Sequence, residues 1–120
     1  MEDLLSNIEE DVLALVGQIE YGDISDLPTY WKSLLDSLLK LDMFRGVPAI
    51  EVSEVLNKVP ANLKDTSLVR LTEQMEEISA ISSTDTIEDE DLSDLRDMAV
   101  DFEKRFMHLL EGIQENASSE

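Results

Sequence analysis

The segment from about Asp89 to Gln114 constrains the fold more than any other part of this chain, because its apolar residues recur at alternating steps of three and four positions. An α-helix completes a turn every 3.6 residues, so side chains at these steps share one face of a helix roughly 39 Å long. A helix of that length needs other helices, or a second copy of the chain, to cover its apolar face. The face comprises Leu92, Leu95, Ala99, Phe102, Phe106, Leu109 and Ile113.

Three earlier segments repeat this spacing, and none shows the strict alternation that is typical of a strand. Their apolar stripes are Leu5, Ile8, Val12, Leu15 and Ile19, then Trp31, Leu34, Leu38 and Leu41, then Leu68, Leu71, Met75 and Ile78. A shorter helix is expected after Pro48, with Ile50, Val55, Leu56 and Val59 directed inward. The pattern predicts an all-α protein, a four- or five-helix antiparallel bundle-like domain with a long C-terminal helix.

Glycine, proline and small polar residues mark the expected ends of these helices. Gly22 suits the left-handed position that closes the first helix, and Pro28 suits the first turn of the second. Pro60 ends the short third helix, and Asp65, Thr66 and Ser67 supply caps for the fourth. Residues 82–86 are read as a linker. We predict a single helical domain over residues 1–113 and a disordered polar tail over residues 114–120.

One apolar cluster at the break after the second helix has two interpretations. Met43, Phe44, Val47 and Pro48 lie together there, beside Arg45. They either pack into the core at the break or form an exposed contact surface for a partner.

The charge of the chain is strongly one-sided and unevenly placed. It has 28 acidic and nine basic residues, for a net charge of −19. Residues 1–31 hold eight acids and no Lys or Arg, whereas residues 73–103 hold twelve acids and one base, Arg96. The excess therefore lies in two blocks. Repulsion within such blocks works against the compact state, which points to a partner or to a role in solubility.

Ten acidic residues in these blocks fall off the apolar stripes and are the candidate partner-binding residues. Carboxylates in the first turn of a helix are stabilised by its macrodipole, which accounts for part of the second block. Asp97 and Asp101 lie further along and four residues apart, where like charges repel. The alternative is a solvated face that keeps the protein soluble. The candidates are Glu9, Glu10, Asp11, Glu88, Asp89, Glu90, Asp91, Asp94, Asp97 and Asp101.

The chain is poor in the residues that catalysis and metal binding use. It contains no Cys and a single histidine, His108, so thiolate chemistry, a Cys- or His-rich zinc site and a Ser-His-Asp arrangement all lack parts. The oxygen-rich stretch 84–94 lacks the glycine and the final Glu of a calcium-binding loop. We predict no enzyme, no catalytic residue, no cofactor and no metal.

The same charge argues against two classes of partner. Anionic membranes and nucleic acid phosphates would both repel the chain, and no apolar run approaches the roughly 18 residues that span a bilayer. The acidic N-terminal residues do not resemble a secretion signal, so a cytoplasmic location is expected.

The function predicted from these observations is non-enzymatic binding to a basic surface of another protein. Its most concrete form is an inhibitor that mimics nucleic acid and occupies a nucleic-acid-binding protein. The alternative is a small helical structural or assembly subunit of a larger complex, a homodimer through the C-terminal helix being one form of it.

Overall fold

The described part of the protein is entirely helical apart from turns and loops. A computed structural model describes residues 2–22, 24–82 and 88–118. Over these residues five α-helices and two short 3₁₀ segments form, and no strand is present. They are α1 (Glu2–Tyr21), η1 (Ile24–Asp26), α2 (Leu27–Leu39), η2 (Asp42–Phe44), α3 (Val52–Asn57), α4 (Thr66–Ser82) and α5 (Asp89–Ser118).

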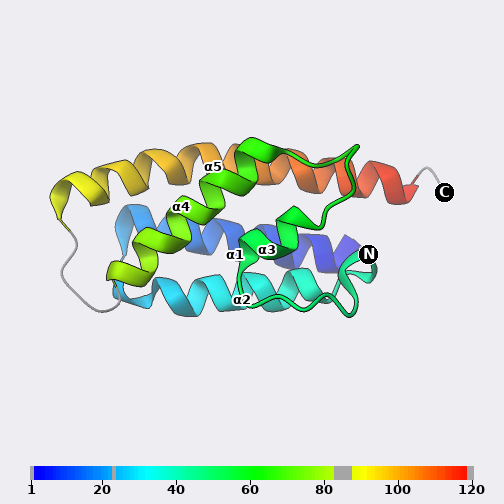
Figure 1. The fold of residues 1–120 in the computed structure, drawn as a ribbon, viewed down its shortest axis with the longest axis horizontal. Coiled ribbons are helices and arrows are strands. Elements are labelled where there is room, and N and C mark those ends of the chain that lie inside the picture. Colours follow the sequence, from blue (N-terminus) through cyan, green and yellow to red (C-terminus); the bar gives the residue numbers. More distant parts are fainter. Residues whose placement is uncertain (1, 23, 83–87, 119–120) are drawn as a thin grey trace.

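The four longer helices are α1, α2, α4 and α5, and each runs in the opposite direction to the one before it, as the prediction of an antiparallel bundle-like domain requires (Figure 1). Helices α1, α2 and α5 lie along the length of the molecule, and α4 crosses obliquely in front of them (Figure 1). Helix α1 packs against both α2 and α5, while α4 packs against α5 and α3 and, less extensively, α2. The predicted fold class is confirmed, including the long C-terminal helix.

The predicted apolar stripes form one core. Every stripe position of α1 and α2, including Leu41 just beyond α2, is buried, and on α5 only Leu92 is half-buried. Phe102 of α5 lies at an aromatic contact between helices: its ring centroid is 5.7 Å from that of Trp31 in α2, edge to face, and 5.3 Å from that of Phe106. Such pairs add to the free energy gained from burial alone.

Helix α4 contributes polar as well as apolar residues to the core, which the sequence analysis did not anticipate. Thr72 and Ser79 are fully buried, and each donates its hydroxyl to the backbone carbonyl four residues earlier, at 2.8 Å. Ser79 also accepts a hydrogen bond of 2.9 Å from the indole Nε1 of Trp31. Buried polar groups are tolerated when they are paired in this way. The predicted stripe positions Leu71 and Ile78 are only half-buried.

The region around α3 differs from its prediction. Helix α3 begins at Val52 rather than directly after Pro48, and Ile50, expected to point inward, is 82% exposed. Its backbone N–H instead donates to the Glu54 side chain, so Ile50 lies outside the helix that would have oriented it. Val55, Leu56 and Val59 are buried as predicted.

The apolar cluster after α2 is divided between core and surface. Phe44 is buried, Val47 is half-buried, and Met43 and Pro48 are exposed. Core packing therefore applies to Phe44, and the cluster does not form one exposed contact surface.

The predictions for the starts of α2 and α4 are confirmed, and the prediction for the end of α1 is wrong. Asp65 accepts a hydrogen bond from the Leu68 N–H at 3.2 Å, as expected of a cap for α4, and Pro28 lies in the first turn of α2. The left-handed conformation predicted for Gly22 is wrong, because Gly46, with φ 79°, is the described glycine with positive φ. Gly22 instead continues the helical pattern, donating its N–H to the Gln18 carbonyl at 3.0 Å.

The boundary between domain and tail is not visible as a change in secondary structure. Helix α5 continues past Gln114 to Ser118, so the sequence placed its end too early. Within the predicted linker, Ser82 ends α4, and residues 83–86 lie outside the described residues.

Candidate functional site: the acidic flank of helix α5

Four of the predicted binding residues form a single line along α5. Glu90, Asp94, Asp97 and Asp101 follow one another at steps of four, three and four residues, and all four are exposed. At 1.5 Å per residue their Cα positions span roughly 16 Å of the helix axis. They lie away from the core face, because Leu95, Ala99 and Phe102 on the same helix are fully buried.

The two middle residues of this line, Asp94 and Asp97, face α4 across a shallow groove. Asp94, Asp97 and Met98 line one side of the groove, and Gln74, Glu77 and Ile78 of α4 line the other. Glu77 is exposed and adds a carboxylate opposite the two aspartates. We call the five carboxylates of Glu77, Glu90, Asp94, Asp97 and Asp101 the acidic flank.

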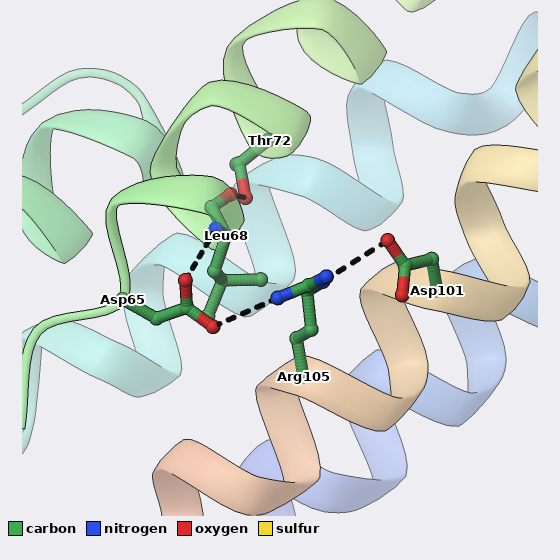
Figure 2. A network of polar contacts seen from close by, with 5 residues as sticks. All are labelled: Asp65, Leu68, Thr72, Asp101 and Arg105. Carbon is green, nitrogen blue, oxygen red and sulfur yellow. Dashed lines mark hydrogen bonds and ion pairs between the residues drawn. The ribbon is translucent and has the colours of Figure 1, made fainter.

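One end of the acidic flank is neutralised by Arg105 (Figure 2). Its Nε donates to Asp101 at 3.0 Å, and its Nη1 donates to Asp65 at 3.3 Å, so the guanidinium bridges α5 to the start of α4. The hydrogen bond and charge of Asp101, with those of Asp65, raise the pKa of Arg105 above its ordinary value. All three side chains are at least one-third exposed, so water screens the pair.

Asp94 and Asp97 carry no such compensation. Within the described residues neither carboxylate has an ion pair or a side-chain hydrogen bond, in contrast to Asp101. The middle of the acidic flank therefore presents uncompensated negative charge to solvent.

The candidates at the start of α5 have a structural role as well. The backbone carbonyl of Glu88 accepts the Leu92 N–H at 2.9 Å, which closes the first turn of the helix. Asp89, Glu90 and Asp91 occupy that turn and are exposed. Their charges favour the helix macrodipole, so part of this acid stabilises α5 locally.

The three candidates on α1 are spread around that helix. Glu9 and Glu10 are exposed, but Asp11 is half-buried and accepts a hydrogen bond from the Ser37 hydroxyl of α2. Consecutive helical residues point about 100° apart, so the three side chains do not share a face. Asp11 joins α1 to α2 and is not a free carboxylate.

Two further acidic residues of this region, one in α4 and one just before its start, were not among the candidates from the sequence. Glu77 lies across the groove from Asp94 and Asp97, and Asp65 forms an ion pair with Arg105. Glu77 lies three residues after Gln74, so helical spacing places these two side chains on one flank of α4, a signal visible in the sequence. The sequence did not reveal that this flank would face α5.

The chemistry offered by the acidic flank is electrostatic attraction. Across the part of the chain that the structure describes, no three His, Asp or Glu side chains come together in a way that could hold a metal ion. The single histidine, His108, is exposed on α5.

None of the helices over the described ranges combines the length and the apolar character needed to cross a bilayer.

Comparison of the chain with protein-family models, with curated proteins and with solved structures finds no match.

Proposed function

We propose that this protein is a non-enzymatic binding protein whose acidic flank occupies a basic surface of a partner protein. The observation that carries the proposal is the pair Asp94 and Asp97. Both are exposed and uncompensated on a well-packed helix, with Glu77 facing them from α4. Carboxylates held at fixed spacing on packed helices lose little freedom when a basic surface binds them.

The energetics of the helix support a role outside folding. Glu90 and Asp94, and likewise Asp97 and Asp101, are four residues apart on α5. Like charges at this spacing destabilise a helix by about 0.2–0.5 kcal/mol per pair. Arg105 offsets this at Asp101, and the macrodipole offsets it at Glu90, but neither reaches the middle of the flank.

A nucleic-acid-binding protein is the more specific partner that we propose. Steps of three and four residues place carboxylates roughly 4.5–6 Å apart along the axis of α5. Phosphates rise by about 3.4 Å along one strand of DNA, so the carboxylates are more widely spaced than successive phosphates but form a row of negative charges on the same scale of a few ångströms. The expected mechanism is competition, in which the acidic flank excludes DNA or RNA from the partner.

The alternative is a helical assembly subunit, and one form of it is a homodimer through the C-terminal helix. Leu95, Phe102, Phe106 and Ile113 of the C-terminal stripe are buried against the chain's own helices. A dimer through this stripe would have to unpack the core. An assembly role would need another surface of the molecule.

The test compares removal of the two uncompensated charges with a matched removal elsewhere on α5. Partners captured from cell extract are identified, and their association rates are measured with the wild type, Asp94→Asn/Asp97→Asn and Glu111→Gln/Glu115→Gln. Glu111 and Glu115 are exposed near the other end of the same helix, so the loss of net charge is identical.

We expect the Asp94/Asp97 variant to associate about tenfold more slowly, and added salt to slow the wild type in the same direction. The partner should also release DNA or RNA when the wild-type protein binds. Equal rates for all three proteins, with no salt dependence, would leave solubility as the role of the acidic flank.

A further inference from the structure

A second groove lies on the opposite flank of α4 from the acidic flank. It is bounded by α2, by the segment that leads into α3, and by α4, and its volume is about 440 Å³. That volume is within the range of sites that hold a ligand or a few side chains of a partner. Nothing in the proposed function uses this groove.

The walls of this groove are largely apolar. Trp31 and Leu35 of α2, Val52 at the start of α3 and Ala80 of α4 all line it. Because the indole N–H of Trp31 already donates to Ser79, the ring has no unpaired donor to offer there. At its rim Ile50 is 82% exposed, second only to Tyr21 among the large apolar side chains that the structure describes.

Acidic side chains reach the groove from each of its three sides. Asp36 comes from α2, Glu51 from the segment before α3 and Glu76 from α4, against one cation, Lys32. The carboxylate of Glu76 is held in place, because it accepts the backbone N–H groups of Val52 at 3.2 Å and Ser53 at 3.0 Å. Burial, followed by the charge of Glu51, raises the pKa of Glu76, whereas these hydrogen bonds lower it.

We infer that this groove binds an amphipathic helix of a partner protein, one that carries apolar side chains flanked by Lys or Arg. Two helices and a loop form a trough of the kind in which such a helix places its apolar face. Ile50 extends the apolar contact beyond the trough, and Asp36, Glu51 and Glu76 complement flanking cations.

The net charge of the protein favours a basic partner helix over a second copy of the chain as the occupant of this groove. The net charge of −19 on each molecule opposes self-association.

The probe for this inference is a synthetic amphipathic peptide with Leu at helical steps of three and four and Lys at the flanking positions. The control peptide has Glu in place of each Lys. Binding is followed through the fluorescence of Trp31, the only tryptophan in the chain, at an ionic strength of about 0.15 M. We expect saturable binding of the Lys peptide, with a change in Trp31 emission, and none of the Glu peptide.

Two pairs of variants locate the contact. Ile50→Ser removes the apolar rim, and Ile81→Ser is its control at an isoleucine that is 55% exposed and does not line the groove. Asp36→Asn/Glu51→Gln removes two groove charges, and Glu111→Gln/Glu115→Gln removes two charges elsewhere. Since these side chains are exposed, circular dichroism should show each variant folded.

We expect affinity for the Lys peptide to fall about tenfold with Ile50→Ser, as burial of one isoleucine would require, and severalfold with the Asp36/Glu51 variant. The two controls should bind like the wild type. Unchanged affinity of Ile50→Ser would overturn the inference, as would equal binding of the two peptides. A loss of affinity caused instead by Asp94→Asn/Asp97→Asn would place the peptide on the acidic flank, which contradicts this inference and leaves the proposed function standing.

Discussion

Glu76 and Glu77 are neighbours in α4, yet they belong to two different surfaces. Glu77 is exposed on the flank that faces α5, where it joins Asp94 and Asp97 around a shallow groove. Glu76 is half-buried on the flank that faces α3, where it binds two backbone N–H groups. About 100° of rotation around the helix separates them.

The contrast shows that position, not residue type, decides what a carboxylate does in this acidic protein. On the α3 side, the Glu76 carboxylate satisfies the N–H groups of Val52 and Ser53, two buried residues. On the α5 side, the carboxylates are surrounded by water, and the ion pair that does form, with Arg105, is exposed. The first arrangement stabilises the fold, and the second leaves charge available to a partner.

The largest effect is expected from the core on which both flanks rest. Phe102→Ala should lower the free energy of unfolding by about 3–5 kcal/mol, because it leaves a cavity between Trp31 and Phe106. Denaturant titration followed through Trp31 fluorescence measures this loss. Val100→Ala, at a side chain that is 43% exposed on the same helix, should cost little. Equal losses in the two variants would mean that α5 does not pack through Phe102.

The comparison of Glu76 with Glu77 can be tested directly. Glu76→Ala should lower the free energy of unfolding by about 1–3 kcal/mol, since it leaves the buried N–H groups of Val52 and Ser53 without their acceptor. Glu77→Ala removes the same charge from an exposed site and should change stability by less than about 0.5 kcal/mol. Chemical denaturation measures the free energy of unfolding of both variants. Similar losses would show that Glu76 does not stabilise the fold more than Glu77 does.

Glu76 should also make stability depend on pH. Its pKa is raised above the ordinary 4.5, first by burial and then by the charge of Glu51, so the folded state takes up this proton more readily than the unfolded state does. The resulting stabilisation is complete below pH 4.5 and is lost as the pH rises through the raised pKa. Lys32 and Asp36 are the other charged side chains that line the same groove.

Glu76→Gln isolates this contribution from the titration of the other carboxylates. Relative to this variant, the wild type should gain stability as the pH falls from neutral toward 4.5. Nuclear magnetic resonance titration of the Glu76 side chain should give a pKa above 4.5. A pKa at or below that value, or stability curves that stay parallel with pH, would contradict the expectation.

The smallest effect is expected from the exposed bridge of Arg105 to Asp65. A double-mutant cycle with Asp65→Asn and Arg105→Gln should give a coupling weaker than the loss caused by Glu76→Ala, because water screens both side chains. The coupling should shrink further as salt is added. A coupling energy that salt does not change would show that the ion pair is better shielded from solvent than the exposure of its two side chains indicates.

The sequence by itself determined the fold class and most of the core. Stripes at steps of three and four leave little choice but helices, and a helix with one apolar face has to bury it. Phe102, Phe106, Trp31 and Leu38 were therefore placed correctly in the core. The line of Glu90, Asp94, Asp97 and Asp101 could likewise be read from its spacing, because helical geometry alone puts these residues on one flank.

Only the tertiary structure decided what surrounds each flank. Helical periodicity specifies which residues share a face but not which helix that face meets, so the position of Glu77 opposite Asp94 and Asp97 was not predictable. For the same reason, the sequence could not predict the ion pair between Arg105 and Asp65 or the hydrogen bond that the Ser37 hydroxyl donates to Asp11. Ile50 was misplaced because it lies in the short segment before α3, outside any helical repeat, where its backbone N–H donates to the Glu54 side chain.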